Sequence, residues 1–278
     1  MDALVSTEWL ADAMVADDLR IVDATYFATD PGRDPAADYA VGHIPGAVFM
    51  DLGGLADPES DLPGMVPPAA LFAERMGALG IGDGVRVVLY DAAPHRTSAR
   101  AWWMLRMFGV RDVAILDGGL AKWVAEGRPL ATGRETSGPG RLSVRQDEAA
   151  VRDLGQMTDN LASGAEQVVD ARSAARFSGA EADPRPSVAS GHIPGSVNIP
   201  YDRLFAADGT WKRGDALQAV FDEAGVDLAR PIVTTCGSGV TAAVLLFGAH
   251  LLGARQVALY DGSWSEWGAD PTTPKAVF

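Results

Sequence analysis

The chain has 278 residues, 47% of them hydrophobic and 22% charged, a composition that suits about two globular domains and excludes a disordered chain or a fibre. Its 23 basic and 37 acidic residues give a net charge of −14, which disfavours nucleic acids and anionic membranes as partners. The single cysteine, Cys236, excludes an intramolecular disulfide and fits a reducing compartment.

No segment of the sequence predicts export or a membrane span. The N-terminus is acidic and has no basic region leading into an apolar core, so it does not resemble a secretory signal. The longest apolar stretch, residues 242–252, is too short to cross a bilayer. No nucleotide-binding fingerprint and no cluster of metal ligands stands out. We therefore predict a cytoplasmic protein that uses neither a cofactor nor a metal.

The first half of the chain alternates short apolar runs with helix-length segments. Residues 86–90 are predicted to form a buried strand, residues 99–108 a helix, and residues 113–116 the next strand. This order indicates a βαβ unit, and therefore a largely parallel sheet covered by helices. Residues 132–142, which follow, are mostly polar and rich in glycine and proline, a composition typical of a linker.

The second half repeats this organisation, with predicted strands at 231–235 and 257–260 and a helix at 242–252 between them. Three sequence matches also recur in the same order at offsets of 147, 149 and 144 residues. They pair residues 21–24 with 168–171, 42–48 with 191–197, and 111–119 with 255–263. We therefore predict an α/β fold with two tandem domains, residues 1–131 and 143–278, each a mostly parallel sheet flanked by helices.

Cys236 directly follows the predicted strand 231–235, at the edge of the sheet where parallel α/β proteins bind ligands. Gly237 and Gly239 let the next loop bend tightly, and a helix is predicted to begin near Ala242. Inward amide groups and the positive end of the helix dipole would stabilise a thiolate there. We predict that Cys236 is a nucleophile, although a free cysteine is more often a buried structural residue.

The two α/β copies, the Gly-His-Ile-Pro-Gly sequence in each, and the Cys-Gly-Ser-Gly-Val-Thr loop together resemble the rhodanese superfamily, in particular its two-domain sulfurtransferases of the thiosulfate/3-mercaptopyruvate type. The resemblance covers nearly the whole chain and implies two rhodanese-like domains. It also implies that the cysteine accepts sulfur as a persulfide and passes it to a thiol or cyanide. The implied catalytic residues are Cys236 and Ser238, and the implied active-site loop also contains Gly237, Gly239, Val240 and Thr241.

The residues after the cysteine bear on the sulfur donor. Thiosulfate enzymes of the family typically carry Arg and Lys there, where this chain has Gly237 and Ser238, and the loop is similar to that of the mercaptopyruvate enzymes. Thiosulfate is a dianion that would favour two cations beside the sulfur. Mercaptopyruvate has one carboxylate, which the planar fork of arginine matches. The resemblance therefore predicts 3-mercaptopyruvate as the donor, with thiosulfate as the alternative.

Arg176 and Arg185 are the candidate donor-binding residues, because the family has two substrate-binding arginines with this nine-residue spacing. The alternative is that they form surface salt bridges to Glu181 or Asp183. Arg172 follows a predicted strand and is interpreted as a structural ion-pairing residue.

The first copy lacks the nucleophile, because Asp91 aligns with Cys236 and a carboxylate cannot carry transferable sulfur. The first domain is therefore predicted to be non-catalytic. His43 and His192 lie in equivalent turns of both copies, although only one copy has the cysteine, so both are assigned to the fold. His95 lies in the loop after Asp91 and is not assigned to catalysis.

One departure from the family concerns a proton relay. Mercaptopyruvate enzymes often place an acidic residue and a histidine after the first Gly-His-Ile-Pro-Gly, but here Gly53 and Gly64 stand at those places. A Ser–His–Asp relay with Ser238 is therefore not expected. Asp51 and Asp61 are the candidates for a substitute.

Two other classes of function are weighed against a sulfurtransferase. A cysteine phosphatase or arsenate reductase needs Cys-x5-Arg, and Ala242 stands where the arginine is required. A noncatalytic sulfur carrier or binding module would show no turnover with any small donor. A persulfide on the single cysteine needs an external acceptor such as thioredoxin, glutathione, another small thiol or cyanide.

Overall fold

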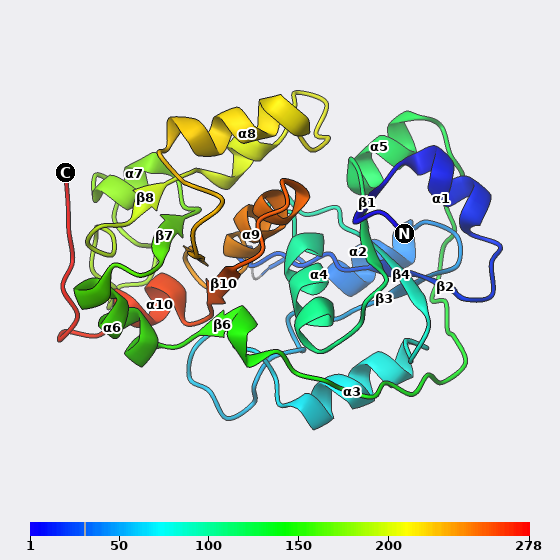
Figure 1. The fold of residues 1–278 in the computed structure, drawn as a ribbon. Helices are drawn as coiled ribbons and strands as arrows, with labels where there is room; N and C mark the ends of the chain where they lie inside the picture. The colour runs from blue at the N-terminus through cyan, green and yellow to red at the C-terminus, as the bar shows by residue number, and fades with distance from the viewer. Residues whose placement is uncertain (31) are drawn as a thin grey trace. The chain divides into compact units, whose positions relative to one another are not determined.

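The computed structural model describes residues 1–30 and 32–278 and divides the chain into two compact units. Unit 1 comprises Met1–Pro58, Val66–Asp147 and Ala207–Trp211, and unit 2 comprises Glu59–Met65, Glu148–Ala206 and Lys212–Phe278. Each unit is built around one five-stranded sheet in which every strand pair is parallel. The predicted class, two tandem α/β domains with helix-flanked parallel sheets, is confirmed (Figure 1).

The sheet of unit 1 has the strand order β1-β5-β4-β2-β3. Its strands are β1 (Leu4–Val5), β2 (Leu19–Asp23), β3 (Ala47–Phe49), β4 (Arg86–Tyr90) and β5 (Val113–Leu116). Its helices are α1 (Thr7–Ala13), α2 (Pro35–Val41), α3 (Ala69–Ala78), α4 (Ser98–Met107) and α5 (Gly119–Ala125). The strand and helix predicted for residues 86–116 therefore form as expected.

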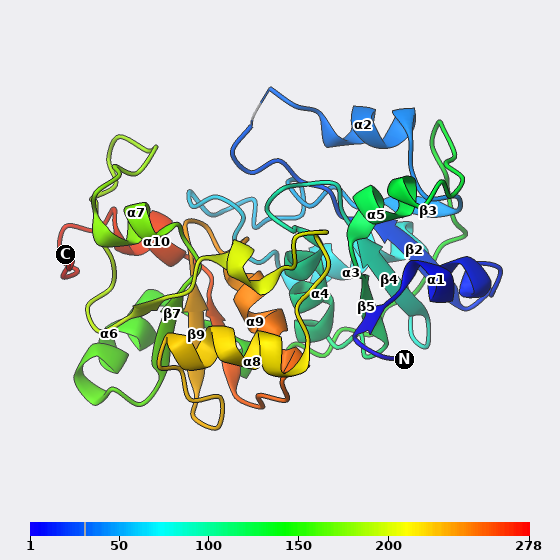
Figure 2. The ribbon, with the colours of Figure 1, turned by 90° about the horizontal axis from the view of Figure 1, so that it is seen from above.

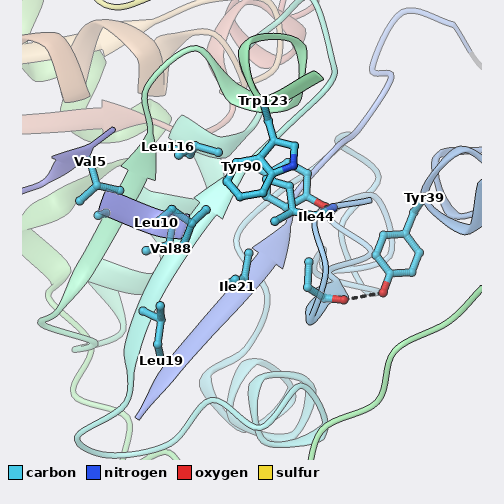
Figure 3. Close-up of a cluster of buried hydrophobic side chains, with 12 residues drawn as sticks. Val5, Leu10, Leu19, Ile21, Tyr39, Ile44, Val88, Tyr90, Leu116 and Trp123 are labelled. Carbon is cyan, nitrogen blue, oxygen red and sulfur yellow. Dashed lines mark hydrogen bonds between the residues drawn. The ribbon is translucent and has the colours of Figure 1, made fainter. Parts of the chain in front are cut away.

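One face of this sheet carries a cluster of buried side chains to which α1, α2 and α5 contribute (Figure 3). Val88 and Tyr90 of β4 point to this cluster because alternate residues of a strand share a face. Trp123 of α5 is fully buried beside them. The hydroxyl of Tyr39 at the rim donates to the carbonyl oxygen of Ala47 at 2.5 Å, which satisfies its polar end.

Unit 2 repeats the topology in the order β6-β10-β9-β7-β8. Its strands are β6 (Val151–Arg152), β7 (Gln167–Asp170), β8 (Val197–Asn198), β9 (Ile232–Thr235) and β10 (Val257–Tyr260). Its helices are α6 (Leu154–Ser163), α7 (Ala174–Ser178), α8 (Gly214–Glu223), α9 (Ala242–Leu251) and α10 (Ser263–Trp267), with 3-10 turns at Glu148–Ala150 and Tyr201–Leu204. Helix α9 contacts β9 and β10, and Figure 2 shows it beside β9. Its first eight residues are buried, which explains why its sequence is apolar on every side.

The two Gly-His-Ile-Pro-Gly turns have the structural role predicted for them. The ring of His43 stacks on Tyr39, and that of His192 stacks on Phe177, each with centroids 4.0 Å apart. Nδ1 of each imidazole lies 2.8 Å from the carbonyl oxygen of the residue that it stacks on. Both histidines are buried, so they belong to the fold of their own units.

The segment predicted as a linker lies along unit 1. The amide of Gly140 donates to the carbonyl of Gly77 at 2.8 Å, and that of Asp83 to the carbonyl of Arg141 at 3.0 Å. A Cβ at Gly77 would lie 2.8 Å from the Gly140 carbonyl oxygen, so this close approach depends on glycine. Among the described residues, no helix is both long and apolar enough to span a bilayer.

Candidate active site

Cys236 lies at the carboxyl end of β9, which runs between β10 and β7 in the sheet of unit 2. Cys236 is only 2% exposed, so its thiol is held inside the loop that joins β9 to α9. In doubly wound sheets this edge is where ligands bind, because helix N-termini and loop amides converge there. The structure thus places the single thiol where the sequence predicted it.

The loop after Cys236 presents unpaired amide groups. Among the residues that the structure describes, the amides of Gly237, Ser238, Val240 and Thr241 donate to no protein acceptor. Gly239 has φ +76°, a value that glycine adopts without strain and that allows the sharp turn. Successive free amides of this kind form a site for an anion such as a thiolate or a persulfide.

The outer side of the loop is held by its carbonyl groups. The carbonyl oxygen of Gly237 accepts from the amide of Ser265 at 2.9 Å, from the Ser265 hydroxyl at 2.6 Å and from Nη1 of Arg185 at 3.2 Å. The carbonyl oxygen of Cys236 accepts from the amide of Trp264 at 3.0 Å. Because these carbonyls are engaged by the residues around α10, the loop is held with its free amides available.

Both candidate arginines reach this loop. A Cβ built on Gly237 would lie 3.5 Å from Nη2 of Arg176 and 3.8 Å from Nη2 of Arg185. Their side chains are 22% and 31% exposed, so the guanidinium groups are partly accessible. The structure therefore brings the thiol and the two predicted donor-binding cations together in unit 2.

Asp183 holds the two arginines, so the ion pair weighed as the alternative is also present. Its carboxylate accepts from Nη2 of Arg176 at 2.6 Å, and from Nε and Nη2 of Arg185 at 2.8 and 3.0 Å. The Asp183 side chain is 1% exposed, whereas Glu181 is exposed. Sequence reasoning considered Asp183 only as a surface partner. Its position two residues before Arg185 is the feature of the sequence that could have indicated this role. From there its side chain also accepts a hydrogen bond from the amide of Arg185 at 3.0 Å.

The titration of Asp183 predicts how acid affects unit 2. Burial would raise the pKa of Asp183, but hydrogen bonds from Arg185 and Arg176 outweigh it and lower the pKa from 3.8 to about 2. The ionised carboxylate of Asp183 therefore stabilises the folded unit fully above the pKa that it has in the unfolded chain. This stabilisation is lost as the pH falls from about 4 to about 2. We expect the stability difference between the native chain and Asp183→Asn in urea unfolding to shrink across this range. A constant difference would contradict this assignment.

Ser263 is a site residue that sequence reasoning missed. It has φ +50°, which is rare for a residue with a side chain, and its hydroxyl accepts from the amide of Cys236 at 3.3 Å. Its counterpart in unit 1, Gly119, has φ +58°. The available signal is the match of residues 117–119 with 261–263, in which serine replaces glycine at a position that requires positive φ.

Substitutions at Ser263 should separate its hydrogen bonds from its backbone strain. Its hydroxyl also donates to the carbonyl of Tyr260 at 2.7 Å, so Ser263→Ala loses both bonds, at a cost of about 1–2 kcal/mol in the free energy of unfolding. Ser263→Gly loses the same bonds but relieves about 1 kcal/mol of strain, so it should be the more stable variant. Chemical denaturation followed by circular dichroism compares them. An alanine variant more stable than the glycine variant would refute the argument.

Arg172 has the structural role that the sequence predicted. Its Nη2 lies 2.7 Å from the carboxylate of Asp170, and the two side chains are 2% and 1% exposed. It also donates to the carbonyl of Gly191 at 2.7 Å and lies over the ring of Trp264. These contacts occupy the guanidinium, so it serves the fold of unit 2.

Asp91 occupies the equivalent place in unit 1, directly after β4. Its carbonyl accepts from the amide of Leu120 at 3.2 Å, as that of Cys236 does from Trp264. Its carboxylate accepts from the amide of Ser98 at 2.9 Å. Burial raises the pKa of Asp91 in spite of this bond. A buried, hydrogen-bonded carboxylate thus stands where unit 2 carries its thiol.

The family's relay positions hold no side chains here. Residues 59–65 belong to unit 2, and a Cβ built on Gly64 would lie 3.9 Å from the carbonyl oxygen of Ser238. Gly53 lies in unit 1, as does Asp51, whose exposed carboxylate accepts from the amide of Gly54 at 3.0 Å. Asp61 is exposed.

Comparison with known proteins agrees with this geometry. Residues 6–126 and 153–270 each match the family model of the rhodanese-like domain. The chain is 41% identical to 3-mercaptopyruvate sulfurtransferase of Homo sapiens over 271 residues, which cover 95% of this chain and 91% of that protein. It is 39% identical to thiosulfate sulfurtransferase of Gallus gallus over 271 residues, which cover 95% and 93%. The crystal structure of the 3-mercaptopyruvate sulfotransferase SseA from Escherichia coli matches with a TM-score of 0.86 at 38% identity, over 96% of this chain and 100% of that one. The chain therefore belongs to the rhodanese family and carries two rhodanese-like domains in tandem.

Proposed function

We propose that this chain is a sulfurtransferase that moves sulfur from 3-mercaptopyruvate, through a persulfide on Cys236, to a thiol or to cyanide. The observation that carries the proposal is the loop of unit 2, in which the only thiol of the chain lies among unpaired amides beside Arg176 and Arg185. Relatives named 3-mercaptopyruvate sulfurtransferase, which align over most of this chain, support it.

The loading step uses the residues of the site in distinct roles. Arg176 and Arg185 bind the carboxylate and the keto oxygen of the donor, and Ser238 donates a hydrogen bond to it. The Cys236 thiolate attacks the donor's sulfur, so that an S–S bond forms as the C–S bond breaks. The electron pair of the C–S bond leaves on carbon as the enolate of pyruvate, which takes up the proton of the donor thiol. The loop amides of Gly237 and Val240 then stabilise the persulfide anion.

The discharge step needs an acceptor from outside the chain, because Cys236 is its only cysteine. A thiolate or cyanide attacks the outer sulfur, the S–S bond breaks, and its electron pair returns to Cys236. Thioredoxin, glutathione and other small thiols fit this chemistry, since each provides a thiolate. We place the reaction in the cytoplasm, where such thiols are kept reduced.

Thiosulfate is the second candidate donor, because a relative named thiosulfate sulfurtransferase aligns over 95% of this chain. Gly237 and Ser238 favour mercaptopyruvate, since neither residue adds a cation beside the sulfur. A noncatalytic carrier or binding module is the third candidate. It is disfavoured because it would give no role in turnover to a thiol that lies beside two arginines.

A side-by-side donor assay tests the proposal. Cyanide serves as acceptor, 3-mercaptopyruvate and thiosulfate are compared, and the intact mass is recorded after donor alone. We expect preference for mercaptopyruvate and a mass gain of one sulfur atom. Preference for thiosulfate would support the second candidate, and no turnover with either donor would refute both.

A further inference from the structure

The carboxylate of Asp183 is an unusual component of a site that binds anionic donors. It is 1% exposed and lies between two guanidinium groups that reach the catalytic loop. A buried anion of this kind weakens the attraction of the site for any negatively charged ligand. Its presence therefore calls for a reason beyond donor affinity.

The net charge of this arginine cluster is +1. Arg176 and Arg185 contribute two positive charges, and Asp183 removes one. The hydrogen bonds from both arginines hold the pKa of Asp183 at about 2, so its carboxylate is ionised throughout the neutral range. The neighbouring Arg172 adds nothing, because it is paired with Asp170 at 2.7 Å.

The hydrogen bonds of Asp183 also determine which N–H groups of the two arginines remain free to bind a ligand. It occupies Nε and Nη2 of Arg185, and Nη1 of Arg185 bonds the carbonyl of Gly237. It binds Arg176 through Nη2 alone. Within the described part of the chain, the buried Nε of Arg176 has no acceptor. The cluster thus keeps most of its free N–H groups on Arg176, and Arg185 keeps the second N–H of its Nη2, so that both arginines can still reach a single carboxylate.

We propose that Asp183 sets the donor preference of this site by charge, favouring a monoanionic α-keto acid over a dianion such as thiosulfate. The inference rests on the proposed function. Asp183 acts through the two arginines, so it is a positioning and specificity-determining residue. A net charge of +1 matches one carboxylate, whereas a dianion would leave one negative charge unbalanced in a partly desolvated site.

The test compares kcat/KM for 3-mercaptopyruvate and for thiosulfate, with cyanide as acceptor, over a series of salt concentrations. Asp183→Asn removes the charge with little change of shape, and Asp183→Ser removes it without placing an amide N–H against a guanidinium. Asp183→Glu keeps the charge. Glu181→Gln is the matched control, because it removes an exposed charge from the same segment. Circular dichroism establishes which variants are folded.

We expect Asp183→Asn and Asp183→Ser to raise the ratio of thiosulfate to mercaptopyruvate kcat/KM by about tenfold, because the net charge of the cluster doubles. Salt should suppress thiosulfate use more steeply in these variants than in the native chain. Asp183→Glu and Glu181→Gln should keep the native ratio. If Asp183 had only a structural role, its replacement would lower kcat/KM for the two sulfur donors equally.

The inference is overturned if either folded neutral variant keeps the native ratio, or if Glu181→Gln shifts it as much. Failure of the proposed function has a different signature, since the native chain itself would then load no sulfur from mercaptopyruvate. A native chain that uses mercaptopyruvate, with an unchanged ratio in the variants, refutes only the role of Asp183.

Discussion

Cys236→Ser is expected to lower sulfur transfer from either donor by at least about 10⁴-fold, because the hydroxyl does not form a persulfide. The fold should survive, since serine has nearly the shape of cysteine and the backbone amide at this position keeps its bond to Ser263. The cyanide assay measures the loss. Intact mass after incubation with donor should show no added sulfur.

The control for this variant is the stability of unit 2. Thermal unfolding should shift by only a few degrees, because replacing one buried thiol by a hydroxyl costs about 1–2 kcal/mol. Transfer that persists in the folded serine variant would remove Cys236 from the mechanism.

Arg185→Ala and Arg176→Ala are each expected to lower kcat/KM for 3-mercaptopyruvate by about 100-fold, which corresponds to about 2.7 kcal/mol for a charged hydrogen-bonded contact. The dependence of the rate on cyanide should change little, because the acceptor attacks the persulfide after pyruvate has left. Arg230→Ala is a matched control, since Arg230 is an exposed arginine of the same unit. Steady-state kinetics with each substrate varied in turn separate the two effects.

The two arginine variants should differ in stability. The side chain of Arg185 bonds the carbonyl of Gly237 and the hydroxyl of Ser265 in addition to Asp183, whereas among the described residues the side chain of Arg176 bonds Asp183 alone. Arg185→Ala should therefore lower the melting temperature further. Equal loss of donor use in Arg230→Ala would show that the effect comes from general charge and not from the site.

Much of the fold follows from local patterns in the sequence. The strands at 113–116 and 257–260 occur at the predicted residues, because short apolar runs bounded by turns are buried in parallel sheets. The internal repeat predicted that both halves share one topology, which the two strand orders confirm. The place of Cys236 was predictable for the same reason, since a residue that follows a central strand lies at the ligand-binding edge.

Other features depend on contacts between residues that are distant in the chain. Residues 59–65 belong to unit 2, and residues 207–211 to unit 1, where the amide of Trp211 bonds the carboxylate of Asp117 at 2.8 Å. A linear sequence pattern records the composition of such segments but not the unit on which they pack. The sequence therefore did not predict that Gly64 would lie beside the carbonyl of Ser238.

The sequence by itself determined the class of the protein and its repeated architecture, and it predicted a candidate nucleophile and two candidate arginines, because each depends on residue identity and short-range spacing. Only the tertiary structure showed that Asp183 joins both arginines and that Ser263 bonds the Cys236 amide. These roles depend on where side chains point after the chain has folded. Hydrogen bonds and charge pairs act over a few ångströms in space, whatever the separation of the residues in the chain.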